Sequence, residues 1–205
     1  MALPSSGALS LSVVNTELNK SAFAAISMGD ADVRALFGKP SGVISLSDGY
    51  GKSASFVKTL TIAANTQNYN IRSAAIAAGW DEVTPANVTV VINAGVYVGA
   101  SSTANFGITT GSFPAGSVIT IVNNGYIVGC GGAGGQGGSK YGSGGSGGSA
   151  ISMNYPVTIQ NNGSIFGGGG GGGGGAGSAI RKNGFALTWG GTNGASTTYV
   201  KGAVV

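Results

Sequence analysis

The stretch VITIVNNGYIVG (residues 118–129) leads into a run that is almost pure glycine, residues 131–139. A second copy, VTIQNNGSIF (157–166), leads into nine consecutive glycines. An earlier segment, VTVVINAGVYVG (88–99), aligns with the first copy at an offset of 30 residues. Alternating apolar residues are typical of half-buried strands, and Asn-X-Gly suits tight turns because Asn and Gly tolerate positive φ. Stacked copies would bury a shared apolar layer, so the glycines that follow should occupy a defined place in a folded structure.

The glycine tracts repeat every three residues. Residues 131–139 read Gly-Gly-X three times, and the pattern resumes over 144–149. A period of three is typical of the polyproline II helix, which rises about 3.1 Å per residue and has no internal hydrogen bonds. The amides must therefore bond to neighbouring helices, which only side-chain-free faces can approach closely enough. The pattern predicts packed polyglycine II helices, with a reversal between Lys140 and Ser143, where the register slips.

The composition of the glycine tracts is shared by a flexible Gly/Ser linker and by a silk-like aggregate, and both alternatives stay open. Collagen fits poorly, because it needs one glycine in three and abundant proline, whereas these tracts have two in three and no proline. The repeated lead-in, and the absence of charge between Val83 and Ser139, favour an ordered structure.

The composition is poor in charge and rich in glycine. Glycine accounts for 41 of 205 residues and charged residues for 8%, against about 7% and about 25% in typical soluble domains. Every acidic residue lies before Val83, and the bases beyond it are scattered, which gives the formal net charge of +4. Duplex binding usually takes a cluster of bases, so we expect no nucleic-acid partner.

We predict a mainly β fold with glycine-rich polyproline/polyglycine II helices and a small α/β N-terminal docking unit. Residues 1–56 would form this docking module, residues 57–87 a strand–helix connector, and residues 88–205 the β-repeat plus polyglycine II domain. In the first unit, alternation of serine with apolar residues predicts short strands over 6–12 and 41–47.

Helices are expected at three places. One spans residues 13–20, and another spans 31–37 with Asp30 as N-cap and Gly38 after its end. In the connector, a strand over 56–62 precedes a helix over 71–78, which Asn70 caps and Gly79 stops. Trp80 follows and is expected to be a core aromatic.

The chain carries little catalytic chemistry. It has no histidine, which excludes Ser-His-Asp and Cys-His triads and histidine-based metal sites. Cys130 is the one cysteine, so no internal disulfide can form, and it has no base partner nearby in the sequence. The acidic pairs Asp30/Asp32 and Asp81/Glu82 suit caps and turns better than glycosidase carboxylates. We therefore expect no enzyme, no cofactor and no metal site.

The N-terminal residues lack the basic and apolar regions of a signal peptide, and no apolar run is long enough to span a membrane. Synthesis in a host cytoplasm and release by lysis, within a virus particle, would fit this.

Residues 68–80, residues 116–129 and the glycine tracts together resemble tailed-bacteriophage tail proteins with glycine-rich domains. The glycine part is similar to the tail-fibre tip adhesins of T-even-like phages, and residues 1–51 resemble the start of many phage structural proteins. The resemblance implies polyglycine II helices packed as a sandwich, with loops at the far end that touch the bacterial receptor. It also implies virion tail proteins as partners, an outer-membrane protein or lipopolysaccharide as receptor, and a homo-oligomer. The alternative is a purely structural tail, collar or capsid-decoration protein that binds only other virion subunits.

If the protein is an adhesin, its contact residues should lie where the tracts reverse. Tyrosine and arginine are prominent in recognition surfaces, and a base could meet phosphorylated lipopolysaccharide. An ordinary solvated loop is the alternative for each position. The candidates are Lys140, Tyr141, Ser143, Arg181, Lys182 and Asn183.

Overall fold

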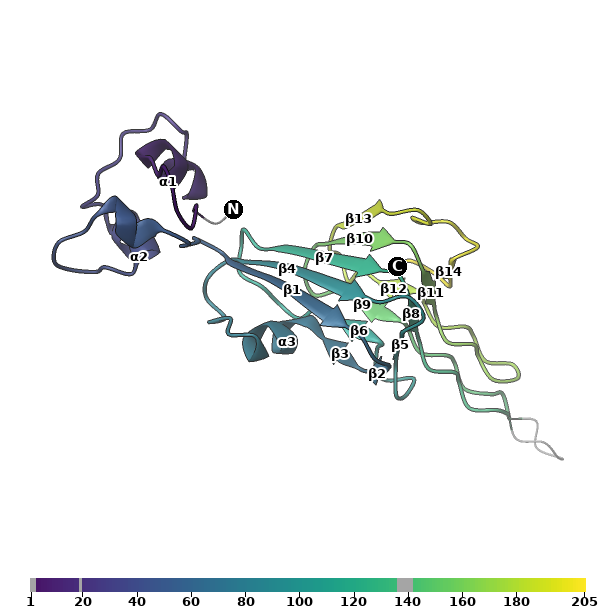
Figure 1. Cartoon of the computed structure of the whole chain (residues 1–205). Helices are drawn as coiled ribbons and strands as arrows, with labels where there is room; N and C mark the ends of the chain where they lie inside the picture. Colours follow the sequence, from purple (N-terminus) through teal and green to yellow (C-terminus); the bar gives the residue numbers. More distant parts are fainter. Residues whose placement is uncertain (1–2, 19, 136–141) are drawn as a thin grey trace.

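The computed structural model describes residues 3–18, 20–135 and 142–205. Its main feature is a parallel β-solenoid whose chain winds repeatedly through three sheets (Figure 1). Sheet A contains β1 (Phe56–Ile62), β4 (Ala86–Ile92), β7 (Val118–Asn123), β10 (Val157–Asn161) and β13 (Leu187–Gly190). Sheet B contains β2 (Thr66–Gln67), β5 (Tyr97–Gly99), β8 (Tyr126–Val128), β11 (Ser164–Phe166) and β14 (Val200–Lys201). Sheet C contains β3 (Tyr69–Asn70), β6 (Ile108–Thr109), β9 (Ile151–Ser152) and β12 (Ile180–Arg181). The prediction of a mainly β fold is confirmed.

The repeated strands stack because each one is apolar on a single face. In β4, alternate residues from Ala86 to Ile92 are buried, as the two-residue period of a strand requires. Their neighbours in register, Ile119 and Ile121 of β7, are also buried, as is Ile159 of β10. These side chains fill the interior between the sheets, which confirms the expectation that stacked copies share one apolar layer.

The alignment of residues 88–99 with residues 118–129 was wrong by one residue. In sheet A, Asn87 rather than Val88 pairs with Val118, and in sheet B, Tyr97 rather than Val96 pairs with Tyr126. The corner after β4 holds four residues, whereas the corner after β7 holds two, so no single offset fits both sides. The corners after β7 and β10 both hold two residues, and there the repeat matches the register, with Asn123 opposite Asn161.

In the three Asn-X-Gly corners, glycine is needed mainly because the backbones of successive turns approach each other closely there. Of these three glycines, only Gly95 has the positive φ that the turn interpretation requires, at 78°. A Cβ on Gly125 would lie 2.3 Å from the carbonyl oxygen of Val96, and one on Gly163 would lie 2.1 Å from that of Gly125. The corners of successive turns therefore stack backbone on backbone, and a side chain would hold them apart.

The predicted connector elements are present with small differences at their ends. The strand matches β1, and the helix is α3 (Ile71–Ala77). The side-chain oxygen of Asn70 accepts a hydrogen bond from the Ser73 amide at 3.0 Å, which confirms the cap. Trp80 is buried, stacks on Phe113 at 4.8 Å and donates its indole N–H to the Thr84 carbonyl, which confirms it as a core aromatic.

The N-terminal residues form a unit with its own small core. It contains α1 (Leu11–Glu17), α2 (Ala31–Phe37) and the short 3₁₀ helix η1 (Leu46–Gly49). The predicted second helix has the observed bounds and ends at Gly38, whose φ is 67°. The first helix begins and ends earlier than predicted. Asp30 occupies the N-cap position without a capping bond from its side chain, which instead accepts the Ser27 amide.

The strands predicted over 6–12 and 41–47 are wrong. The first range ends inside α1, which begins at Leu11, and the second ends inside η1, which begins at Leu46; neither range contains a strand. Serine explains the error, because its hydroxyl bonds to nearby backbone and side chains and so favours caps over strands. Ser45 forms a capping box with Asp48, whose carboxylate accepts the Ser45 amide at 2.9 Å.

This capping box makes the N-terminal unit sensitive to acid. The Ser45 amide, and secondarily Lys39, hold the pKa of Asp48 below its usual value of 3.8. A depressed pKa contributes stability that is present above the unfolded value and is lost as pH falls through the folded value. We expect an NMR titration of the Asp48 carboxyl carbon to have its midpoint below 3.8. A midpoint at or above that of an unfolded peptide would contradict the capping box, and Asp48→Asn should remove this part of the acid sensitivity.

Candidate functional site

Two glycine-rich excursions leave the solenoid between sheets B and C. We call them the glycine hairpins: the first joins β8 to β9 (residues 129–150), and the second joins β11 to β12 (167–179). Figure 1 shows them side by side, projecting away from the solenoid at the end opposite the N-terminal helices. The solenoid thus fixes the roots of both hairpins, because each begins and ends on a paired strand.

The hairpins are joined by backbone hydrogen bonds that recur every third residue. Within the first hairpin, Gly145 donates to Ala133 at 2.8 Å, and Gly148 donates to Cys130 at 2.7 Å. Between the two outgoing arms, Gly129 and Gly132 donate to Phe166 and Gly169, both at 2.8 Å.

The returning arm of the first hairpin lies against both arms of the second. Gly168 and Gly171 donate to its carbonyl groups at Gly148 and Gly145, at 2.8 and 2.9 Å. On another side, Gly147 donates to Gly175 at 2.9 Å. The two hairpins therefore form one hydrogen-bonded bundle rather than two independent loops.

Close contact recurs with the same three-residue spacing. A Cβ on Gly168 would lie 1.9 Å from the Cys130 carbonyl oxygen, and one on Gly171 would lie 1.9 Å from that of Ala133. By contrast, a Cβ on Gly169 or Gly172 would meet nothing within 4 Å. Glycine is thus sterically required on the inner faces of the bundle and optional on its outer faces.

The described part of the hairpins carries no charged side chain. Its exposed polar groups are backbone amides and carbonyls and a few serine hydroxyls, such as those of Ser143 and Ser146. Cys130 is partly exposed, and its thiol lies 3.5 Å from the Gly131 carbonyl oxygen. Across the described residues there is no group of three or more His, Cys, Asp or Glu side chains that could hold a metal. Within the same residues, no helix is long and apolar enough to cross a membrane.

Three of the predicted contact residues belong to the first hairpin. Lys140 and Tyr141 lie outside the described residues. Ser143 is exposed on the returning arm, and its backbone is 3.6 Å from the position of a Cβ on Gly173. Gly173 has a φ of 82° and belongs to the turn that reverses the second hairpin. The structure therefore places Ser143 beside the reversal of the second hairpin. The reversal predicted for the first tract, between Lys140 and Ser143, falls partly outside the described residues, so receptor contact at Ser143 stays a prediction.

The other three predicted residues lie elsewhere. Arg181 ends β12, and Lys182 and Asn183 follow it, whereas the second tract reverses at 172–173. The expectation that this group marks a reversal was wrong, because nine identical glycines give no sign of where the turn falls.

These three residues belong to the solenoid. The exposed Arg181 guanidinium lies over the Phe106 ring at 5.8 Å. The Lys182 amide donates to the Val205 carbonyl oxygen. Asn183 has a positive φ of 50° and donates to the Met153 carbonyl oxygen at 2.9 Å, so it ties one turn of the solenoid to the one before. Among the described residues, no hydrogen bond or ion pair joins this group to Ser143.

Two stacked tyrosines of sheet B, an exposed one and a partly exposed one, were missed. Tyr97 and Tyr126 pair in register in sheet B, and their rings stack at 4.4 Å with 13° between the planes. The signal was present in the sequence, since each tyrosine opens the second strand of its copy. The unequal corners hid it, because the offset of 30 aligned Tyr97 with Ile127.

A model of the phage tail fibre adhesin Gp38 family matches residues 57–204, which covers the solenoid and both hairpins. The chain belongs to this family. No curated protein and no solved structure matched it. The resemblance of the glycine part to tail-fibre tip adhesins is thereby confirmed. Membership of the Gp38 family makes the protein a phage tail component and implies, in general terms, binding to other tail components and to a host surface.

Proposed function

We propose that this protein is the host-recognition tip of a tail fibre and that it acts by binding, without catalysis. The observation that carries the proposal is the arrangement of its parts. The helices of the N-terminal unit lie at one end of the molecule, and the glycine hairpins project from the opposite end (Figure 1). A tip protein needs this polarity, because one end must hold the fibre while the other reaches the cell.

We further propose that the hairpin arms are polyglycine II helices. Donors three residues apart bond to the same neighbouring arm, which matches the three residues per turn of this helix. The inner glycines leave no room for a Cβ, as expected where such helices pack. A bundle bonded on several sides would hold its outer end still, which lowers the entropy lost on binding a receptor.

The N-terminal unit, residues 1–56, is proposed as the docking module. The family match begins at residue 57, just beyond this unit, so family membership gives no information about the partner of the unit. Its surface exposes large apolar side chains, with Phe23 at 96% and Val43 at 92% of their full accessibility. Such side chains would be covered by another tail protein. The domain boundaries and a homo-oligomeric state stay predictions.

Receptor contact is proposed at the outer end of the hairpins, through Lys140, Tyr141 and Ser143. Because the described hairpin residues are uncharged, a lysine and a tyrosine there would supply the charge and the aromatic surface that the bundle lacks. An outer-membrane protein or lipopolysaccharide is the proposed receptor. Arg181 and Lys182 lie on the solenoid, so we leave them out of the proposed surface and use Lys182 as a comparison.

The test is competition for adsorption to host cells. Purified protein, added in excess, is expected to slow phage adsorption, and the Lys140→Ala, Tyr141→Ala double variant should need about tenfold or more additional protein for the same effect. Lys182→Ala should block as well as the unchanged protein.

Protein that binds no cells, yet is required for intact particles, would contradict the proposal. That result would support the purely structural alternative.

A further inference from the structure

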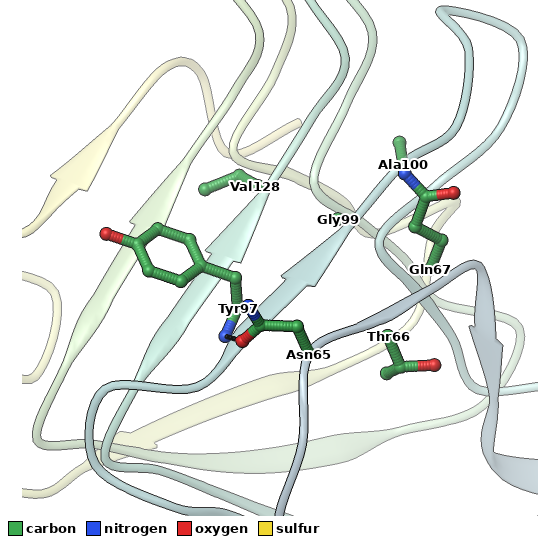
Figure 2. A pocket seen from close by; sticks show the side chains of 7 residues that line it. All are labelled: Asn65, Thr66, Gln67, Tyr97, Gly99, Ala100 and Val128. Carbon is green, nitrogen blue, oxygen red and sulfur yellow. Dashed lines mark hydrogen bonds between the residues drawn. The ribbon is translucent and has the colours of Figure 1, made fainter.

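A hollow lies on the outer face of sheet B, away from the outer end of the hairpins. Outward positions in this sheet form a column in register: Gln67, Gly99, Val128, Phe166 and Lys201. Gly99 interrupts the column, since it contributes no side chain between Gln67 and Val128. The result is an open pocket of about 630 Å³ (Figure 2), within the range of about 300–1,000 Å³ typical of small-ligand sites. Its lining residues are Asn65, Thr66, Gln67, Tyr97, Gly99, Ala100 and Val128.

One side of the hollow is aromatic. Figure 2 shows Tyr97 and Val128 on one side of Gly99 and the side chain of Gln67 on the other. One face of the Tyr97 ring is covered by Tyr126, which does not line the hollow, and 47% of the Tyr97 residue surface remains exposed. The stack fixes the orientation of Tyr97, so its second face is a flat apolar surface at the edge of the hollow.

Two amide side chains with free hydrogen-bonding capacity also line the hollow: Asn65 lies beside Tyr97, and Gln67 lies on the other side of Gly99 (Figure 2). The Asn65 oxygen accepts the Tyr97 backbone amide at 2.9 Å, which orients the side chain. The Asn65 NH₂ group and the whole Gln67 amide have no partner among the described residues, and both side chains are exposed. Together these amides offer donors and an acceptor next to the aromatic face.

No charged residue lines the hollow. Lys201, in the same column, is two positions beyond Val128 and lies 6.0 Å from the Phe166 ring. An anion would find no positive charge here, and a purely apolar partner would leave the amides unpaired at a cost in free energy. The chemistry that satisfies both sides is a ring with an apolar C–H face and hydroxyl groups at its edge.

We propose that this hollow binds a neutral saccharide, with one pyranose ring on the exposed face of Tyr97 and its hydroxyl groups bonded to Asn65 and Gln67. The site is separate from the hairpin ends, so it would give the protein a second contact with a glycan-coated surface. Two weak contacts on one rigid body bind more strongly than either alone when both can engage at once.

The chain offers a matched pair of variants for the test. Gly99→Val puts a branched side chain into the floor of the hollow, at a position where φ is not positive and the new Cβ would meet only Val128 Cγ2, at an ordinary 3.5 Å. Gly190→Val places the same side chain on sheet A, where the nearest atom is Gln160 Cγ at 3.7 Å. Gln67→Leu removes the amide and keeps the aromatic stack.

The probes are neutral tri- and tetrasaccharides of glucose, galactose and mannose, with sialyllactose as the acidic comparison. Saturation-transfer NMR, with irradiation of protein aromatic protons, should reveal ring protons of at least one neutral oligosaccharide. Gly99→Val should lower that signal about tenfold or more, Gln67→Leu should lower it in part, and Gly190→Val should leave it unchanged.

Three results would overturn the proposal. The first is no transfer to any neutral probe. The second is equal transfer with the unchanged protein and Gly99→Val. The third is a Gly99→Val variant that binds saccharide normally but fails to enter particles, which would identify the face as a protein interface. None of these results depends on the outer ends of the hairpins, so the proposed receptor contact stands or fails separately.

Discussion

Alanine at Gly168 or Gly171 is expected to loosen the bundle of glycine hairpins, whereas alanine at Gly169, between them, should leave the packing of the bundle almost unchanged. At the two inner positions, the new Cβ would lie 1.9 Å from a carbonyl oxygen of the first hairpin, and the contacted atom is backbone, which cannot rotate aside. Forcing such a contact costs about 1–3 kcal/mol or more. At Gly169 there is open space, and φ is not positive. Alanine there should be neutral or slightly stabilising, by up to about 1 kcal/mol, through the lower entropy of the unfolded chain.

Amide hydrogen exchange is the appropriate measurement, because the bundle is held by its own amides. We expect Gly168→Ala and Gly171→Ala to lower protection of the bonded amides at Gly145 and Gly148 by about tenfold or more, and Gly169→Ala to leave it unchanged. The solenoid core should stay protected in all three variants, which separates local loosening from global unfolding. Equal effects at the three positions, or no protection in the unchanged protein, would contradict the packed bundle and favour a flexible linker.

The elements that could be predicted from the sequence are those whose signal is local. The strand over 56–62 and the helix over 31–37 were found because each has an uninterrupted pattern and a marked end. Repeats with equal corners were also paired correctly. Serine-rich alternation at 6–12 and 41–47 failed because the same residue type serves strands, caps and turns.

The pairing of the first repeats and the position of the hairpin turn could not be predicted, because they depend on corner lengths and turn positions that the residue pattern does not show. Two extra residues in the corner after β4 changed the pairing on both sides of it, and a one-residue error in a strand exchanges its two faces. This error concealed the stack of Tyr97 on Tyr126 and, with it, the hollow at Gly99. The turn at 172–173 could not be located within nine identical residues. Of the candidate contact residues, Ser143 lies beside the turn of the second hairpin and Arg181, Lys182 and Asn183 lie on the solenoid, and receptor contact at any of them stays a prediction.

Substitution of the buried asparagine that links successive turns of the solenoid should destabilise the protein much more than substitution of an exposed asparagine in an equivalent corner. Asn123 is fully buried, and its NH₂ group donates to the side-chain oxygen of Asn161 at 2.9 Å and to the Ser164 carbonyl oxygen at 3.1 Å. Its own oxygen accepts the Gly125 amide at 3.2 Å. Asn123→Ala leaves these buried groups without that partner, so we expect a loss of about 3 kcal/mol in the free energy of unfolding, measured by urea denaturation.

Asn162 is the matched control, because it follows Asn161 in the equivalent corner of the next turn of the solenoid but is exposed. It also bridges two turns, donating to the Asn124 side chain at 3.0 Å and accepting the Thr192 amide at 2.8 Å. Water can replace these bonds, so Asn162→Ala should cost about 1 kcal/mol or less. The double variant Asn123→Ala, Asn161→Ala should lose less free energy of unfolding than the sum of the two single changes. The reason is that each single change leaves the buried amide of the other residue without its hydrogen-bond partner. Additive losses, or equal losses at Asn123 and Asn162, would mean that the corners are held by their glycine backbone contacts and not by the buried asparagine pair.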